Sequence, residues 1–371
     1  MTVLITGIGL LTTLGENAPQ TWQRYLQGET GLQPKGLPTG TVGVIGTTTQ
    51  PLETILSQTV AEALADAGLA APLVDGGVVV GSSRSFQAQW EAWLRSEEPS
   101  LPLNHWLERL PTAVSQQVAQ QAGIVGPVLN PTAACATGIW AIAQGAMLIQ
   151  QGQCEVVLAG AVESPLSPLT FAGFQRLGVL ASERVAPFDR DRHGLGLAAG
   201  GAILVLESER HSRSRQVQPY GLIAGVGLTA DAEQIAAPSL SQRGAIAAIQ
   251  KALRQSQCTP AEIDYIHSHG TGTRLNDAAE AAWIQKLFGF HTPVTSSKGA
   301  VGHTLGAAGA IATALSCLSL KDQHIPPCVG CQHPAFDLDI VLKARAAHLR
   351  RILCCSYGFG GQNAVLVLAA P

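Results

Sequence analysis

The stretch LITGIGLLT, residues 4–12, is an apolar run with a Gly-x-Gly pair, and a similar stretch, LIAGVGLTA, follows at 222–230. We predict that both are apolar strands that run into Gly-x-Gly and then into a loop. A second pattern also occurs twice, in which a strand, small residues and an Ala/Gly-rich helix follow one another; its two copies are GPVLNPTAACATGIWAIAQGAMLI at 126–149 and TPVTSSKGAVGHTLGAAGAIATAL at 292–315. Self-similarity at half the chain length predicts a duplicated domain and not a solenoid, whose repeats are far shorter.

A polar connector separates the two halves. It is SERHSRSRQVQPYG at 208–221, whose Arg- and Ser-rich composition interrupts the apolar pattern. We therefore predict an N-terminal unit of residues 1–210 and a C-terminal unit of residues 211–371. Within each half, buried strand patterns such as DGGVVVGSS at 75–83 alternate with helical patterns such as LETILSQTVAEALADAGL at 52–69. This alternation predicts sheets covered by helices, with the two Ala/Gly-rich helices at the centre.

The composition excludes several classes of protein. Of the 371 residues, 46% are hydrophobic, 13% are charged and 40 are glycine, which is typical of a closely packed α/β enzyme. The net charge of −3 gives no electrostatic reason to bind nucleic acid or an anionic membrane, so we expect neither as a partner.

Two apolar stretches need a separate interpretation. The N-terminus, MTVLITGIGLLTTLGEN, lacks the basic region of a signal peptide, and we expect a first strand there. The stretch at 299–320 is long enough to span a membrane, but it is built from Gly, Ala, Ser and Thr around His303. This composition favours a central helix of a packed core.

The eight cysteines show no disulfide-framework spacing, which favours a reducing cytoplasm. The segment HIPPCVGCQHP at 324–334 groups two cysteines with two histidines, a set that can bind zinc. However, it holds a single Cys-x-x-Cys, and its two prolines are typical of a connector. We expect no metal.

Cys135 lies in NPTAACATGIWAIAQG, residues 130–145, just ahead of a helical pattern. A cysteine among small residues is most often a buried apolar side chain. At the start of a helix it can also be a nucleophile, because aligned backbone dipoles lower the thiol pKa and free N–H groups can receive an oxyanion. The local sequence leaves both interpretations open.

Two histidines in the second half could act as its acid–base partners. His269, in IHSHGTGTRLNDAAE at 266–280, is expected at the carboxyl end of a strand. His303, in SSKGAVGHTLGAAG at 296–309, is expected at the start of the helix that echoes the Cys135 helix. A single histidine is usually structural, whereas a pair at strand–helix junctions points to proton transfer or hydrogen bonding to substrate.

Five motifs together resemble one family. They are TAACATG, PFDRDRHG, HSHGTGTRLNDAAE, SSKGAVGHTLGAAGA and SYGFGGQNA, and they occur in family order over nearly the whole chain. The chain resembles the β-ketoacyl-acyl carrier protein synthases of the elongating, synthase I/II type, in the thiolase superfamily. The resemblance implies a duplicated α/β thiolase-like fold, layered αβαβα, with the two Ala/Gly-rich helices in its central layer.

The resemblance also implies an activity. Cys135 would accept an acyl group as a thioester from acyl carrier protein, and malonyl-carrier protein would lose CO₂ and attack it. His269 and His303 would support decarboxylation and stabilise the enolate. No metal or cofactor is expected, because the phosphopantetheine arrives on the carrier protein, and the family expectation is a homodimer.

Further roles follow from the matching motifs. Lys298 would pair with Glu280 and order the site, with Asp277 in the neighbouring acidic position. The backbone N–H groups of Cys135 and Phe359 would form an oxyanion hole, and the Phe359 ring would gate the acyl channel. The expected substrate contacts are Thr271 and Thr273, which match threonines that bind the phosphopantetheine arm, and Phe174, for which ordinary core packing is an equal alternative.

The chain departs from the family pattern at several positions. His193 replaces the usual Asp, Ala199 the usual Glu and Gln362 the usual Thr. The chain is also short for the family, with most of the loss between residues 30 and 125. These departures leave acyl length and pathway open.

Three alternatives remain from the sequence. A thiolase would need a second catalytic cysteine in a Cys-x-Gly loop, whereas Cys354 and Cys355 precede SYGFGG. A coenzyme A-primed initiating synthase would carry Asn in place of His303. A non-catalytic subunit that sets chain length in a heterodimer would normally lack Cys135.

Overall fold

The computed structural model describes the chain except for residues 37–41, 48–49, 96–102, 238 and 240. A ten-stranded sheet crosses the described residues in the order β10-β9-β13-β14-β8-β1-β7-β6-β4-β5. Its strands from the first half are β1 (Val3–Leu11), β4 (Gly77–Gly81), β5 (Val128–Leu129), β6 (Val156–Glu163) and β7 (Gly200–Ser208). Those from the second half are β8 (Gly221–Ala230), β9 (Tyr265–His267), β10 (Val294–Thr295), β13 (Arg351–Gly358) and β14 (Gln362–Ala369).

The strand order repeats about the centre of the sheet. Reading outward, β8-β14-β13-β9-β10 takes the same places as β1-β7-β6-β4-β5 on the other side. The two halves join where β1 pairs antiparallel with β8, through Leu4 with Leu222 and Ile5 with Gly221. The two echoing stretches of sequence therefore meet each other at the middle of the sheet. The division at residues 210 and 211 stays a prediction.

The Gly-x-Gly pairs lie inside the strands, so the prediction that they end them was wrong. The reason is helix packing: a Cβ on Gly9 would lie 1.8 Å from the Thr59 carbonyl oxygen of α2 (Leu52–Asp66). In the second half, a Cβ on Gly227 would lie 1.8 Å from the Ala248 carbonyl oxygen of α9 (Arg243–Gln255). The glycines thus let one helix in each half rest directly on its strand.

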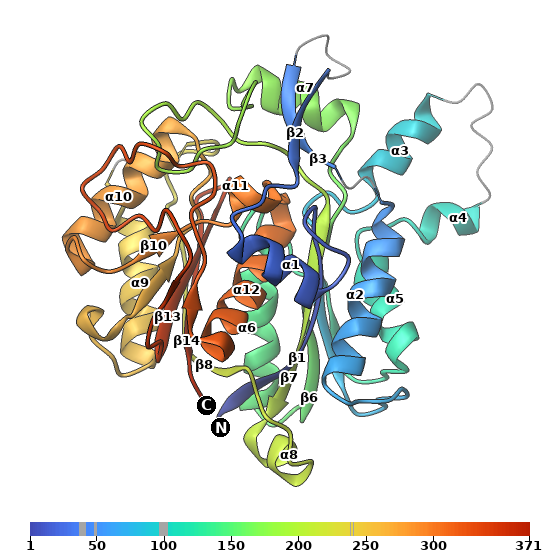
Figure 1. The fold of residues 1–371 in the computed structure, drawn as a ribbon. Coiled ribbons are helices and arrows are strands. Elements are labelled where there is room, and N and C mark those ends of the chain that lie inside the picture. Colours follow the sequence, from blue (N-terminus) through green and yellow to red (C-terminus); the bar gives the residue numbers. More distant parts are fainter. Residues whose placement is uncertain (37–41, 48–49, 96–102, 238, 240) are drawn as a thin grey trace.

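The layers follow from this packing (Figure 1). The two central helices, α6 (Thr137–Gln150) and α12 (Ala308–Asp322), lie between the two halves of the sheet, whereas α2 and α5 (Ala113–Ala122) cover one outer face and α9 and α10 (Arg274–Phe288) the other. A Cβ on Gly138 would lie 2.4 Å from the Ala310 nitrogen, so the central helices touch through backbone. This arrangement confirms the predicted αβαβα layering.

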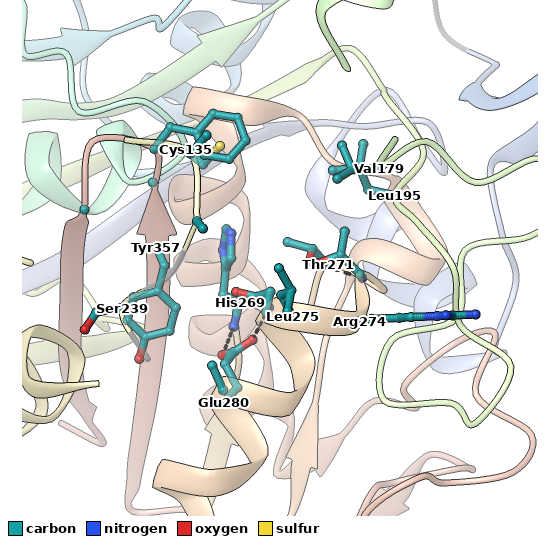
Figure 2. A pocket seen from close by; sticks show the side chains of 18 of the residues that line it. Cys135, Val179, Leu195, Ser239, His269, Thr271, Arg274, Leu275, Glu280 and Tyr357 are labelled. Carbon is teal, nitrogen blue, oxygen red and sulfur yellow. Dashed lines mark hydrogen bonds between the residues drawn. The ribbon is translucent and has the colours of Figure 1, made fainter. Parts of the chain in front are cut away.

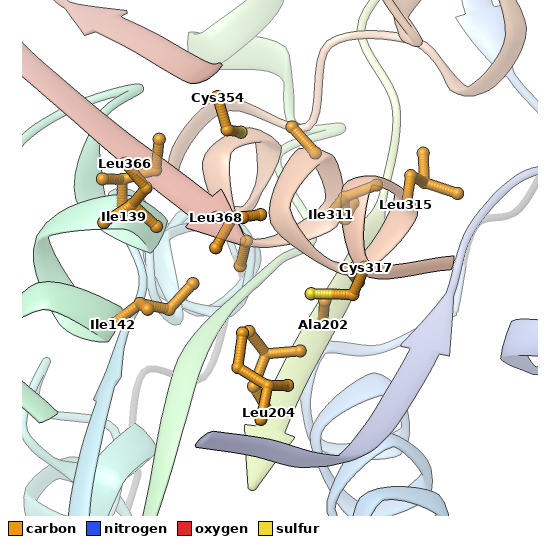
Figure 3. Packing of buried hydrophobic residues seen from close by; sticks show 14 of the residues in the cluster. Ile139, Ile142, Ala202, Leu204, Ile311, Leu315, Cys317, Cys354, Leu366 and Leu368 are labelled. Atoms are coloured by element: carbon orange, nitrogen blue, oxygen red, sulfur yellow. The ribbon is translucent and has the colours of Figure 1, made fainter. Parts of the chain in front are cut away.

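The central core joins both halves of the chain. Figure 3 shows Ile139 and Ile142 of α6 packed with Ile311 and Leu315 of α12, among strand residues such as Leu204. Every residue of α12 from Ala308 to Leu320 is buried. Burying these apolar side chains stabilises the fold and fixes the two helices relative to each other.

The apolar stretch at 299–320 is not one helix. It forms part of α11 (Lys298–Val301), then η2 (Leu305–Ala307), and α12 begins only at Ala308. Within the described residues, no helix is long and apolar enough to cross a membrane. The remaining described elements are α1 (Ala18–Leu26), β2 (Leu32–Gly36), β3 (Val42–Gly46), α3 (Gln87–Leu94), α4 (Leu103–Leu107), α7 (Pro168–Arg176), α8 (Glu209–Ser214), η1 (Pro260–Glu262), β11 (His324–Ile325) and β12 (Arg345–Ala346).

Candidate active site

Cys135 lies in a tight turn directly before α6. Ala134 has a left-handed backbone conformation with φ of 47°, which is uncommon for a residue with a side chain. The turn is held by Thr137, whose hydroxyl donates to the Ala134 carbonyl at 2.7 Å and accepts from the Ala133 N–H at 2.9 Å. Strained backbone that the surroundings over-determine is typical of functional sites.

Burial raises the pKa of the Cys135 thiol to about 11. The opposing influences are the positive charges of Lys298 and Arg84 and a hydrogen bond from the Phe359 N–H, while the Glu163 charge adds to the rise. The expectation of a lowered thiol pKa was therefore wrong for the free enzyme. The side chain is only 7% exposed, and desolvation of the thiolate outweighs the helix start.

A cavity of about 530 Å³ opens in front of Cys135. Its walls include His269, His303 and Thr271, and Figure 2 shows His269 between Cys135 on one side and Glu280 on the other. The rings of Phe174 and Phe359 also line it and stack on each other, with centroids 6.1 Å apart and planes at 26°. Phe174 itself is 3% exposed and packs in the same apolar cluster as Cys135, so it is both a core residue and a cavity wall.

The two histidines face each other edge to face, with ring centroids 5.4 Å apart. Burial lowers the pKa of both imidazoles well below the usual value, and the Lys298 ammonium lowers it further. Both are therefore neutral at physiological pH. Within the described part of the chain, Nδ1 of His303 has no hydrogen-bond partner. Neutral rings of this kind can donate hydrogen bonds to negative charge that develops on a substrate.

His303 was expected at the start of the helix that echoes the Cys135 helix, but that helix, α12, begins only at Ala308. His303 lies in the turn between α11 and η2, where its N–H donates to the Gly196 carbonyl at 2.7 Å and its carbonyl accepts from the Ala198 N–H at 3.2 Å. The glycines around it let the chain turn before α12 can start: Gly302 has φ of 81°.

Lys298 fixes the tautomer of His269. Its ammonium donates to the His269 carbonyl oxygen and lies 3.3 Å from Nδ1 of the same residue. An ammonium has only donors, so Nδ1 must accept and the ring proton must be on Nε2. His269 therefore has an N–H on the ring nitrogen that Lys298 does not contact.

Glu280 holds the same histidine through its backbone. Its carboxylate accepts from the N–H groups of His269 at 2.8 Å and Gly270 at 2.5 Å, and from Nδ2 of Asn276 at 2.7 Å. The expected direct pair with Lys298 is replaced by an indirect arrangement, because both groups bind His269. Burial raises the pKa of Glu280 and lowers that of Lys298, and attraction between the two charges opposes both changes.

The neighbouring loop is ordered by Asp277. This buried carboxylate accepts from the N–H groups of Phe188 at 2.8 Å and Gly272 at 3.2 Å, and it lies 3.6 Å from Nε of Arg192. The loop presents Thr271 and Thr273 to the cavity, with their hydroxyl oxygens 2.9 Å apart. Asp277 thus acts on the cavity wall through backbone and not by direct contact.

The positions that depart from the family pattern lie in different environments. His193 lines the cavity, with Nε2 3.3 Å from the Ser182 hydroxyl. Ala199 is fully buried, and Gln362 is a half-buried residue that pairs with Ala230 of β8. Only His193 of the three is placed to touch a ligand in this cavity.

Sequence reasoning missed His267, a third buried histidine, which lies next to the site. The Ser316 hydroxyl donates to the Ala312 carbonyl at 2.7 Å, so it must accept from Nδ1 of His267 at 3.2 Å. Nε2 then accepts from the hydroxyl of Ser297, the residue before Lys298, at 3.2 Å. Burial lowers the pKa of His267 to about 3. Its position beside His269 in the sequence was the available signal.

The remaining cysteines are buried and free. Cys354 and Cys355 point into apolar clusters on either side of β13, and Cys328 and Cys331 lie in a turn packed against the second half of the sheet. Among the residues that the structure describes, no group of three or more His, Cys, Asp or Glu side chains is placed to hold a metal ion.

Comparisons with known proteins identify the family of the chain. Residues 46–212 match the model of the β-ketoacyl synthase N-terminal domain, and residues 220–332 match that of its C-terminal domain. The chain is 31% identical to nodulation protein E of Rhizobium sp. (strain N33), over 98% of both chains. It is 30% identical to 3-oxoacyl-[acyl-carrier-protein] synthase 2 of Coxiella burnetii, over 99% of this chain and 98% of that protein.

Solved structures show the same likeness over the full length. A type II polyketide ketosynthase in complex with its acyl-carrier protein and bound to the hexaketide superposes with a TM-score of 0.94 at 26% identity, covering 100% of this chain and 99% of that one. The ishigamide ketosynthase/chain length factor superposes with a TM-score of 0.91 at 27% identity, with the same coverage. The chain therefore belongs to the β-ketoacyl synthase family of condensing enzymes, with the thiolase fold that its motifs predicted.

Proposed function

We propose that this chain elongates an acyl chain by decarboxylative Claisen condensation, with Cys135 as the nucleophile and malonyl-acyl carrier protein as the extender. The observation that carries the proposal is the convergence of Cys135, His269 and His303 on one cavity, with Lys298 holding His269. Family membership supports the reaction class, and the geometry supports the role of each residue.

In the first step, the Cys135 sulphur attacks the carbonyl carbon of an acyl thioester. The carrier's thiolate leaves and takes the proton of the Cys135 thiol. The Phe359 N–H is directed at the Cys135 sulphur, and with the Cys135 N–H it would bind the oxyanion. Burial disfavours a thiolate but not a neutral thioester, so the same environment that raises the thiol pKa favours the acylated enzyme.

In the second step, the bond from the malonyl carbon to its carboxylate breaks and CO₂ leaves. Its electron pair forms an enolate, whose oxygen accepts hydrogen bonds from His269 Nε2–H and from His303. The enolate carbon attacks the acyl carbonyl on Cys135, and the C–S bond breaks. Cys135 leaves as a thiolate and is reprotonated from solvent, which balances the proton lost in the first step.

We propose acyl carrier protein as the partner, because a carrier-bound arm can reach Cys135 along Thr271, Thr273 and the paired rings of Phe174 and Phe359. The reaction as written requires no metal or organic cofactor beyond the phosphopantetheine on the carrier. A homodimer in the cytoplasm is the expected assembly. A heterodimer with a chain length factor is the alternative, since the ishigamide structure contains such a subunit. Light scattering of the purified chain distinguishes the two.

The test of the proposed function is to incubate the protein with acyl carrier proteins of graded acyl length and to measure the mass of the Cys135 peptide. We expect one range of lengths to appear as thioesters on Cys135, and none on the Cys135→Ala variant. Acylation at another cysteine, or none at any length, would contradict the proposal.

A further inference from the structure

Glu163, the last residue of β6, has a fully buried carboxylate that the reaction above does not use. Among the described residues, five donors surround it. Four come from the turn after β4, namely the Ser82 hydroxyl at 2.7 Å, the Ser83 N–H at 2.9 Å and hydroxyl at 2.6 Å, and the Arg84 N–H at 2.9 Å. The fifth is the Gly306 N–H in η2, at 3.0 Å. All five are neutral groups.

The Gly306 contact reaches the segment that carries His303. This histidine is anchored on its own backbone by Gly196 and Ala198, and Gly306 follows it by three residues. Between them, Leu305 has a left-handed backbone with φ of 44° and packs in the same apolar cluster as Cys135. A strained turn keeps this shape only where contacts hold both of its ends. Gly196 and Ala198 hold the end at His303, and Glu163 holds the end at Gly306.

The fit at Gly306 is close. A Cβ added there would lie 2.7 Å from Oε2 of Glu163 and 2.9 Å from the Ser83 nitrogen. Any side chain at residue 306 would therefore push η2 away from the carboxylate. This gives a second way to break the same contact without removing the charge.

We propose that Glu163 is a positioning residue, which clamps η2 to the turn after β4 and thereby sets His303 against Cys135. The inference rests on the proposed function, because it concerns the histidine that stabilises the enolate. The Glu163 charge also contributes to the rise of the Cys135 thiol pKa, against Lys298 and Arg84. Glu163 therefore has two separable effects. Its hydrogen bond to Gly306 positions His303 for decarboxylation, and its charge raises the pKa of the Cys135 thiol that is acylated.

The test compares Glu163→Gln and Gly306→Ala with a matched control, Glu207→Gln. Glu207 is another fully buried carboxylate, on the adjacent strand β7, and it binds Thr6, His211 and Arg215 away from the cavity. For each protein we would measure malonyl-carrier protein decarboxylation, the pH dependence of Cys135 alkylation by iodoacetamide, and the melting temperature. Alkylation reports on the thiol even if no carrier protein is accepted.

Glu163→Gln is expected to slow decarboxylation about 10-fold or more, because a small displacement of a catalytic group has effects of this size. It is also expected to lower the pH at which Cys135 becomes reactive, since a negative charge is lost. Gly306→Ala is expected to slow decarboxylation to a similar extent and to leave the alkylation profile as in the wild type. Glu207→Gln is expected to change the melting temperature while decarboxylation stays within about two-fold.

The positioning role is overturned if folded Glu163→Gln or Gly306→Ala decarboxylates within about two-fold of the wild type. It is also overturned if Glu207→Gln, at a comparable fall in melting temperature, loses decarboxylation to the same extent as Glu163→Gln and Gly306→Ala. If Glu163→Gln does not fold, Gly306→Ala carries the test. A wild-type protein that is neither acylated nor able to decarboxylate malonyl-carrier protein would instead refute the proposed function.

Discussion

Lys298 and Glu280 form a charged pair that acts through His269 and not through direct contact, and this leads to an unusual pattern of mutational effects. Both side chains are almost fully buried, at 5% and 1% exposure. Lys298→Met leaves the Glu280 carboxylate without its compensating charge, and Glu280→Gln does the same to the ammonium. Each single change is expected to cost about 3–5 kcal/mol of unfolding free energy, as for other buried pairs that lose one partner.

The double variant Lys298→Met/Glu280→Gln removes both charges. It is expected to be destabilised by about 2 kcal/mol less than the sum of the single variants, because no unpaired charge remains buried. Its activity should not recover. Without the ammonium, Nδ1 of His269 loses the Lys298 donor that makes it an acceptor, and the ring no longer keeps its proton on Nε2 for the enolate.

The assay is denaturant unfolding of all four proteins at neutral pH, together with the rate of malonyl-carrier protein decarboxylation. Recovery of stability without recovery of decarboxylation is the predicted result. Strictly additive losses of stability would show that the two charges are not coupled. A double variant that decarboxylates at the wild-type rate would refute the role of Lys298 in setting the His269 tautomer.

Three further predictions concern the strand–helix packing, a buried histidine and the thiol. Gly227→Ala places a Cβ 1.8 Å from the Ala248 carbonyl oxygen and should cost about 3 kcal/mol in denaturant unfolding, whereas Gly173→Ala in α7, where the Cβ meets nothing within 4 Å, should not destabilise; equal effects would contradict the packing argument. His267 has a pKa of about 3 in the folded protein, whereas the pKa of an unfolded histidine is about 6.5. Between these two pH values only the unfolded chain binds a proton at this residue. The free energy of unfolding therefore falls by about 1.4 kcal/mol for each pH unit from about 6.5 down to about 3. His267→Asn should remove this part of the acid dependence, and an unchanged slope in unfolding measured across that range would count against the buried neutral state. The Cys135 pKa of about 11 predicts that iodoacetamide alkylation of this residue rises about tenfold per pH unit from neutral to mildly alkaline pH, and a rate that is flat above neutral pH would reveal a thiolate already formed.

Features that repeat along the chain could be predicted from the sequence. The echo between residues 4–12 and 222–230 predicted the duplication, and the five motifs predicted the fold and the reaction class. Local composition could not predict where the Gly-x-Gly pairs lie, because the helix carbonyls that exclude a Cβ at Gly9 and Gly227 belong to Thr59 and Ala248, 50 and 21 residues further along the chain.

Electrostatic features of the site were also beyond the sequence. A helix start can lower a thiol pKa only through neighbouring backbone, whereas the pKa of Cys135 depends mainly on burial by residues of both halves of the chain. The family resemblance predicted that Lys298 and Glu280 lie in the same site. It did not predict that the two groups are linked through His269, which both of them bind. Glu163 went unnoticed because its partners lie far from it in the sequence, and nothing local distinguishes it from an ordinary core position. For His267, the one local signal was its place two residues before His269.

In the proposed reaction, Cys135 carries the growing chain while malonyl-carrier protein extends it. The most direct measurement mixes an acyl-carrier protein that acylates Cys135 with malonyl-carrier protein and follows the carrier-bound product by mass spectrometry, for the wild type and for Cys135→Ala. The wild type should form β-ketoacyl-carrier protein extended by one malonyl-derived unit with release of CO₂. The variant should keep the wild-type circular dichroism spectrum and form none. Extension by Cys135→Ala at the wild-type rate would show that Cys135 does not carry the growing chain.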